Sequence, residues 1–222
     1  MIGLVVAMEK EARLFLENTS IKNEEIISSK KVYLGTYLGH NFVLIISGIG
    51  KVNAGISTQI IIDKFNPDYI INFGVAGGKE NSRLSSGDMV LVDKACQYDF
   101  DLSEIDNVSI GYMQDYSTIY YPTNFEKYKG TQFQIRSCAS GDRFTSKPFW
   151  LEIIKNLDAQ VVDMECGAIA QTCLSNNTPL FILKLISDVD GKDDSIFAQY
   201  SNNVKEICNK LPNAIEELIT NL

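Results

Sequence analysis

The chain contains two kinds of hydrophobic pattern. Short runs that are almost wholly apolar predict strands covered on both faces of a sheet, and apolar residues at helical spacing predict helices between those strands. The predicted strands span residues 2–8, 69–78, 89–92, 132–139, 159–162 and 180–186, and residues 31–47 predict a hairpin or meander. The predicted helices span residues 9–16, 51–65, 148–157 and 195–218, and another begins near residue 166. This order predicts an α/β fold, a single domain over residues 1–222 with a central mixed β-sheet flanked by helices.

Two places depart from these patterns. Residues 99–122 are polar and rich in tyrosine, which is typical of a surface for a partner or ligand, or of an amphipathic cover. Pro212 falls inside the last predicted helix, where it lacks the N–H group that the helical ladder needs. We therefore expect a kink or a break in that helix.

The charge of the chain limits its partners. The formal net charge is -8, and the lysines are scattered instead of forming a basic stripe. Binding to nucleic acid or to an anionic membrane depends on concentrated positive charge, so we expect neither partner. No apolar run approaches the roughly 20 residues of a membrane span. The apolar N-terminal run lacks the basic region of a signal peptide, so it is interpreted as a strand.

Cysteine and histidine usage limits the chemistry. The five cysteines are widely spaced and lack a C-x-x-C pair, which indicates neither a disulfide framework nor a zinc site. Reduced thiols are typical of a cytoplasmic protein. The single histidine, His40, excludes a His-based metal cluster and lies in a predicted turn. We expect no metal, and acid and base chemistry is assigned to carboxylates.

Three carboxylates follow predicted strands. Glu11 lies in the first helical turn after the first strand, Glu165 lies where a strand gives way to a helix, and Asp188 follows the last strand. Ligands of open α/β sheets gather at the carboxyl ends of strands, so these acids are candidates for one shared site. The alternative is that they are helix caps or loop carboxylates, and Glu11 also suits an interaction with the helix dipole.

Two glycine-rich segments accompany these acids. Residues 47–51 form a glycine turn before a helix, and residues 74–78 end a buried strand with three glycines. Either segment can bring the backbone close to a ligand. The alternatives are a tight strand-to-helix turn and the packing of crowded strands.

Six segments, taken in order, resemble the 5′-methylthioadenosine/S-adenosylhomocysteine nucleosidases of the nucleoside phosphorylase/hydrolase superfamily. They are residues 7–11 (AMEKE), 47–52 (SGIGKV), 67–78 (PDYIINFGVAGG), 140–144 (SGDRF), 162–165 (VDME) and 186–188 (ISD). The resemblance covers nearly the whole chain and implies a nucleoside phosphorylase-like three-layer architecture. It also implies hydrolysis of the bond between adenine and ribose, as in methionine salvage, without a metal or cofactor.

The resemblance implies a role for each candidate residue. Glu11 resembles the base that activates water, Glu165 the carboxylate that holds the ribose hydroxyls, and Asp188 the acid that protonates N7 of adenine. The implied substrate-binding positions are Met8, Ile49, Val75, Phe144, Thr145, Met164 and Ser187. Phe144 is expected to stack on adenine, and the main chain of Thr145 to read its edge. The implied partners are a small-molecule adenine nucleoside and a second copy of the chain in a homodimer.

The chain departs from the family pattern in three places. Val75 stands where many relatives carry a hydroxyl residue near the base, and Lys184 replaces an arginine usual near Glu165. The second change exchanges a planar fork for a point charge. Residues 99–122 do not align, and relatives accept the group on the 5′ carbon there, so preference among 5′ groups stays open.

Two other functions fit the same fold. A purine nucleoside phosphorylase needs cations around phosphate, and relatives of that kind have an arginine at the position of Asn72. A non-catalytic purine-nucleoside sensor would have no need for three carboxylates around an uncharged sugar. Hydrolysis is therefore the favoured prediction.

Overall fold

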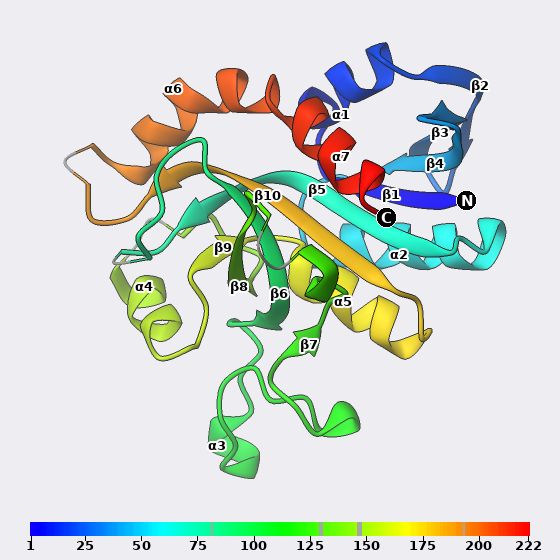
Figure 1. Cartoon of the computed structure of the whole chain (residues 1–222). Helices are drawn as coiled ribbons and strands as arrows, with labels where there is room; N and C mark the ends of the chain where they lie inside the picture. The colour runs from blue at the N-terminus through cyan, green and yellow to red at the C-terminus, as the bar shows by residue number, and fades with distance from the viewer. Residues whose placement is uncertain (81, 129–130, 146–147, 193) are drawn as a thin grey trace.

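The computed structural model describes residues 1–222 except 81, 129–130, 146–147 and 193 (Figure 1). Within the described residues, ten strands form one mixed sheet. The strands are β1 (Ile2–Val6), β2 (Ser20–Ile27), β3 (Lys30–Tyr37), β4 (His40–Ile46), β5 (Tyr69–Gly78), β6 (Met89–Gln97), β7 (Tyr121–Pro122), β8 (Gln134–Ser140), β9 (Val161–Asp163) and β10 (Leu180–Val189). The helices are α1 (Glu9–Glu17), α2 (Lys51–Phe65), α3 (Ser103–Asp106), α4 (Pro148–Lys155), α5 (Cys166–Ser175), α6 (Ile196–Cys208) and α7 (Leu211–Thr220), with short 3-10 helices at η1 (Gln114–Tyr116) and η2 (Glu126–Tyr128).

Part of the sheet closes on itself. Strand β5 pairs in parallel with β1 and β10 and antiparallel with β9. From β10 the pairing continues through β6 and β8 to β9, so β5, β10, β6, β8 and β9 form a closed ring. The remaining strands extend from β5 in the order β1-β4-β3-β2 as an open arm. Closure leaves the strands of the ring without a free edge.

Helices cover both faces of the sheet, which gives three layers (Figure 1). Helices α1, α6 and α7 pack on one face in a core that includes Phe15 and Ile215. Helices α2 and α5 pack on the other face in a core that includes Ile61 and Ile169. Residues of β10 alternate between these two cores, which explains why this strand is apolar from Leu180 to Ile186 except at Lys184. In the described part of the chain, no helix is both long and apolar enough to cross a membrane.

The predicted elements are present, with differences at strand ends and with strands that were not predicted, among them β7. Strand β10 continues to Val189, beyond the predicted end at residue 186, so Asp188 lies within this strand and does not follow it. Strand β6 continues to Gln97, beyond the predicted end at residue 92. Strand β2 was not predicted, because its side chains are mostly exposed and no apolar run marks it. The last predicted helix is split into α6 and α7, and Pro212 lies in the first turn of α7, where its missing N–H has no cost. His40 is the first residue of β4 and pairs with Tyr37, so it lies just after the β3–β4 turn and not in the turn where the sequence placed it.

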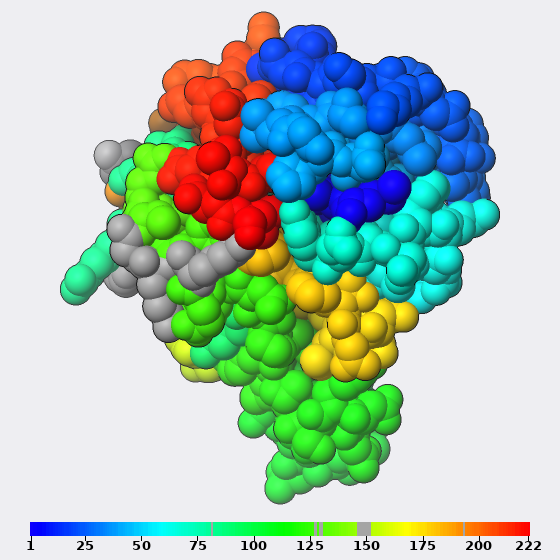
Figure 2. Space-filling view, turned by 45° about the vertical axis from the view of Figure 1, so that its right-hand side comes forward, coloured from blue at the N-terminus to red at the C-terminus, as the bar shows by residue number. Residues whose placement is uncertain are grey.

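Residues 99–122 project from the body of the molecule, at the lower edge of both overall views (Figures 1 and 2). Strand β7 fastens the end of this segment to β6. Tyr121 is fully buried there, whereas Ile105 on α3 is 78% exposed. The tyrosine-rich segment is therefore part core and part exposed surface.

Candidate active site

A cavity of about 350 Å³ lies at the carboxyl ends of β1, β5, β9 and β10. All the residues that the sequence analysis assigned to a site line this cavity. They are Met8, Glu11, Ile49, Val75, Phe144, Thr145, Met164, Glu165, Ser187 and Asp188. The fold thus brings together segments that are far apart along the chain.

Glu11 is 2% exposed and is held by two backbone N–H groups. Its Oε2 atom accepts the N–H of Met8 at 2.9 Å within the first turn of α1. Its Oε1 atom accepts the N–H of Val75 on β5, also at 2.9 Å. Burial raises the pKa of Glu11, and Lys184 together with the two amides offsets part of that rise. The main chain at Val75 therefore anchors Glu11 although the side chain there has no hydroxyl.

Two glycines of β5 make room for carboxylates. A Cβ atom at Gly74 would lie 2.6 Å from Oε1 of Glu11. A Cβ atom at Gly77 would lie 2.9 Å from Oδ2 of Asp188. Both distances are shorter than packing permits, so a larger residue at either position would displace the acid. The glycine cluster thus accommodates side chains of the protein itself.

A β-bulge in β10 precedes Asp188. The register between β10 and β5 shifts between Ile186 and Asp188, which leaves Ser187 as the extra residue. Asp188 is 5% exposed, and its Oδ1 atom accepts a hydrogen bond from the Ser187 hydroxyl at 2.6 Å. Burial raises the pKa of Asp188, and the hydroxyl offsets only part of the rise. A carboxyl that keeps its proton at higher pH suits a general acid, and its place within a strand excludes a helix cap.

Glu165 lies at the junction of β9 and α5, where the sequence placed it. Its Oε1 atom accepts the N–H of Gly50 at 2.9 Å, so the glycine turn before α2 orients this acid. The first N–H of α5, on Cys166, is bonded by Asp163 and not by Glu165. Burial, followed by the charge of Asp163, raises the pKa of Glu165 to about 7.

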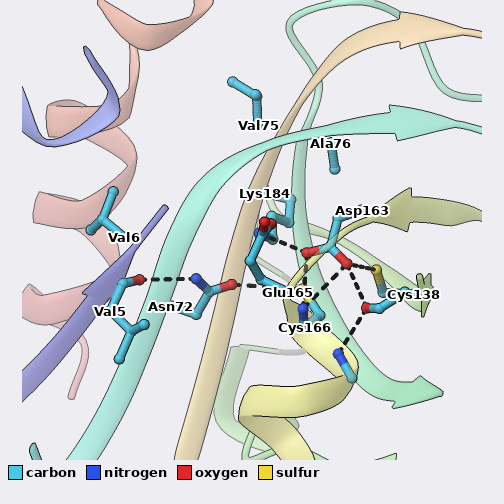
Figure 3. Close-up of polar contacts among 12 residues, drawn as sticks. Val5, Val6, Asn72, Val75, Ala76, Cys138, Asp163, Glu165, Cys166 and Lys184 are labelled. Carbon is cyan, nitrogen blue, oxygen red and sulfur yellow. Dashed lines mark hydrogen bonds and ion pairs between the residues drawn. The ribbon is translucent and has the colours of Figure 1, made fainter. Parts of the chain in front are cut away.

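A buried ion pair lies beside these acids (Figure 3). The Nζ atom of Lys184 is 3.0 Å from Oδ2 of Asp163, and the two side chains are 3% and 2% exposed. Burial alone would raise the pKa of Asp163, but Lys184 and the hydrogen bonds to this acid hold the pKa below its usual value. The sequence indicated that Lys184 lies near Glu165, but it did not identify Asp163 as the ion-pair partner of Lys184.

One group in the described residues has the atoms of a metal site. The ligand atoms of Cys138, Asp163 and Cys166 lie within 4.8 Å of one another. However, Asp163 already pairs with the ammonium of Lys184, and burial raises the pKa of Cys138 to about 11. Metal ligation needs deprotonated thiols, so this donor set favours a hydrogen-bonded cluster.

Aromatic side chains form the outer wall of the cavity. Phe144 packs edge-on against Tyr200, with ring centroids 5.7 Å apart at 68°. Tyr200 and Phe197 come from the first turns of α6, and sequence analysis did not assign either to the site. The signal that was available is their spacing of three residues soon after Asp188, which places both on one helix face.

Asn72 lies outside the described lining of the cavity. It is 1% exposed, and its Nδ2 atom donates to the carbonyl of Val5 at 2.9 Å. Its role in the structure is to join β5 to β1, and its amide brings no positive charge toward the cavity.

The family model of the Phosphorylase superfamily matches residues 1–220, so the chain belongs to this superfamily. A 5′-methylthioadenosine/S-adenosylhomocysteine nucleosidase from Buchnera aphidicola subsp. Acyrthosiphon pisum is 33% identical over 230 residues, covering 100% of this chain and 98% of the relative. The chain therefore belongs to the family of 5′-methylthioadenosine/S-adenosylhomocysteine nucleosidases, and the predicted resemblance is confirmed.

Solved structures with the same family name share the fold. The nucleosidase from Colwellia psychrerythraea 34H in complex with adenine has a TM-score of 0.89 and 26% identity, covering 100% of this chain and 95% of that chain. The nucleosidase from Neisseria meningitidis in complex with methylthio-immucillin-A has a TM-score of 0.88 and 27% identity, with coverage of 100% and 99%. The predicted α/β architecture is confirmed.

The pKa of Glu165 links the site to stability. A carboxyl whose pKa rises on folding from 4.5 to about 7 stabilises the folded state fully below pH 4.5 and loses that contribution as the pH rises through 7. Glu165→Gln removes the ionisation, so this variant should be more stable than the parent at pH 8.5, by on the order of 2–3 kcal/mol, with little difference at pH 5. Urea unfolding at both pH values measures the difference.

The matched control is Glu25→Gln on the exposed strand β2, which should change stability by less than about 0.5 kcal/mol at either pH. A stability difference for Glu165→Gln that is the same at pH 5 and pH 8.5 would contradict the raised pKa.

Proposed function

We propose that this protein hydrolyses the N-glycosidic bond of 5′-methylthioadenosine and S-adenosylhomocysteine, releasing adenine and the 5-thio-substituted ribose. The observation that carries the proposal is the convergence of Glu11, Glu165 and Asp188 on one largely apolar cavity in a member of this nucleosidase family. Relatives of known structure hold adenine or methylthio-immucillin-A, which supports an adenine nucleoside as the small-molecule partner.

The three acids suit three different tasks. Adenine leaves readily only when it is protonated, and Asp188, with its raised pKa, is the proton donor to N7. Glu165 accepts the ribose hydroxyls, and its negative charge favours the oxocarbenium-like transition state. Glu11, held at both oxygens by amides, removes a proton from the attacking water.

The remaining lining residues form the binding surface for the nucleoside. Phe144 stacks on the adenine ring, and the main chain of the buried Thr145 reads the adenine edge. The other positions give apolar walls or support the acids. They are Met8, Ile49, Val75, Met164 and Ser187.

Phosphorolysis is the alternative that the same fold allows. A phosphate dianion needs cations, and Arg143 is the only cation among the described lining residues, which also include four buried carboxylates. Lys184 already pairs with Asp163, and Asn72 carries no charge. This charge balance favours water as the nucleophile.

We further assign residues 1–222 to one catalytic domain that works without a metal or cofactor, with a thioribose product of the kind used in methionine salvage. The continuous sheet and its shared cores support the single domain. A cytoplasmic location is supported by the five cysteines, all of which are free and buried, since a reducing compartment keeps thiols in this state.

We also propose that the protein is a homodimer. Val52 and Ile56 leave an apolar strip exposed on α2, at 71% and 46%, and Ile105 is 78% exposed on the projecting segment. Exposed apolar side chains grouped on one helix face are typical of a protein interface. A second copy is the occupant that the family resemblance implies.

The hydrolysis proposal is tested with methylthioadenosine in phosphate-free buffer. Adenine and free 5-methylthioribose should appear at a rate that added phosphate leaves unchanged. Chromatography of both products measures the reaction. Turnover that requires phosphate and yields a ribose 1-phosphate would show that the protein is a phosphorylase.

Two substrates with different leaving groups distinguish the roles of the three acids. Asp188→Asn should slow release of adenine about 10³-fold or more, because the leaving group stays unprotonated. It should retain much of the activity on a p-nitrophenyl 5-methylthioriboside, whose leaving group needs no proton. Glu11→Gln should abolish both reactions, and Glu165→Gln should impair both binding and turnover. Near-parental adenine release by Asp188→Asn would remove this residue as the acid.

The dimer is tested by light scattering at micromolar concentration, where the mass should be about twice the 24.8 kDa of one chain. The double change Val52→Glu and Ile56→Glu places charge in the apolar strip and should give monomers. Ile26→Glu, at a residue 66% exposed on β2, is the control and should remain dimeric. A fully active monomeric parent would rule out the proposal.

A further inference from the structure

Lys184 is an exception in its strand. It is the only charged residue in the run 180–186, and its side chain is 3% exposed. Strand β10 pairs on both sides at this point, with Gly74 of β5 and Val90 of β6. A buried ammonium is costly unless partners compensate for the lost water. The contacts of Lys184 therefore indicate why a charge lies here.

Asp163 is the direct partner, and it is fixed by donors from three other parts of the site (Figure 3). In addition to the ammonium of Lys184 at 3.0 Å, its carboxylate accepts bonds from a hydroxyl, a thiol and a backbone N–H. These donors are Ser140 Oγ at 2.5 Å, Cys138 Sγ at 3.5 Å and Cys166 N at 3.0 Å. These bonds fix the orientation of the Asp163 carboxylate. The carboxylate in turn fixes the position of the Lys184 ammonium.

The same ammonium lies near both acids of the sugar and water site. Lys184 is the register partner of Gly74, and the space where Gly74 lacks a Cβ atom is filled by the carboxylate of Glu11. Glu165 is two residues beyond Asp163 and shares its neighbourhood. Among the described contacts, Lys184 makes an ion pair with Asp163 and none with Glu11 or Glu165.

The electrostatics agree with this geometry. After burial, which raises the pKa of both Glu11 and Glu165, Lys184 lowers each pKa, and Asp163 raises that of Glu165. Burial alone would lower the pKa of Lys184, but the acidic groups around it hold that pKa well above its ordinary value. The titratable groups facing this cluster are Cys138, Cys166, Cys208 and Tyr98, with Lys10 near Glu11.

Building on the proposed function, we propose that Asp163 and Lys184 are positioning residues for the reaction. Asp163 holds the Lys184 ammonium where its charge acts on Glu11 and Glu165 without bonding to either. A direct bond would occupy the carboxylate oxygens that the ribose hydroxyls and the attacking water need. The ammonium thus offsets part of the negative charge while the oxygens stay available.

The test is the acid limb of the pH profile of kcat/KM, which reports ionisation of the free enzyme. Lys184→Met removes the positive charge and should move this limb to higher pH by roughly one unit. Asp163→Asn removes a negative charge and frees the ammonium to bond to Glu165. This variant should move the limb to lower pH and raise KM. The double variant should lie between the two single variants.

Three further variants keep the outcome decisive. Lys184→Arg retains the charge and should keep the limb near its parental pH. Ser140→Ala removes one bond to Asp163 without changing any charge and should keep the limb near its parental pH, and Lys184→Met carries the test if Asp163→Asn fails to fold. Lys94→Met removes an outer ammonium that pairs with Asp158, and should leave the profile unchanged.

The decisive variants are Lys184→Met and Asp163→Asn. If both fold and the limb stays in place, or moves in the same direction in both, the pair is only structural. Carbon NMR titration of the Glu11 and Glu165 carboxyls in the ligand-free variants tests the same shifts without turnover. Absence of adenine release by the parent protein, with these titration shifts present, would reject the proposed function and retain the positioning pair.

Discussion

Repulsion between carboxylates is the constraint on which this site depends. Glu11, Asp163 and Glu165 share a nearly dry space with one ammonium, where Coulomb interactions are much stronger than in water. Each acid is held in place by specific donors: two amides for Glu11, the Gly50 amide for Glu165, and four groups for Asp163. Helix starts carry the donors Met8, Gly50 and Cys166, and strands β5, β8 and β10 carry the others, so the backbone around the cavity fixes the positions of the charged groups.

Strand β5 is the common reference for the acids. Glu11 arrives from α1 and Asp188 from β10, but each fits against a glycine of β5. The same strand pairs with β1, β9 and β10, which deliver the segments that carry the cavity lining. The spacing of the glycines along one strand therefore fixes the spacing of Glu11 and Asp188. The bulge at Ser187 completes the fit by bringing Asp188 level with Gly77.

Much of this structure could be predicted from the sequence, because wholly apolar runs mark strands buried on both faces and the ordered motifs mark the family. Strand β2 escaped prediction because an exposed edge strand needs no apolar pattern. Tyr200 escaped because its spacing from Phe197 places both on one helix face without showing that this face lines a cavity. The pairing of Asp163 with Lys184 depends on distance across the fold, which spacing along the chain does not reveal.

Because the strand ring is closed, the floor of the cavity and its outer wall should move on different timescales. To open locally, β10 must break hydrogen bonds on both edges at once at Leu183–Leu185, so the amide protons of this central part of the floor should exchange only through events close to global unfolding. The outer wall has no such constraint, because Phe144 and Phe197 are 43% and 66% exposed and belong to a loop and a helix start. A nucleoside can therefore enter and adenine can leave through fast motions of the wall, while the reacting groups keep their positions.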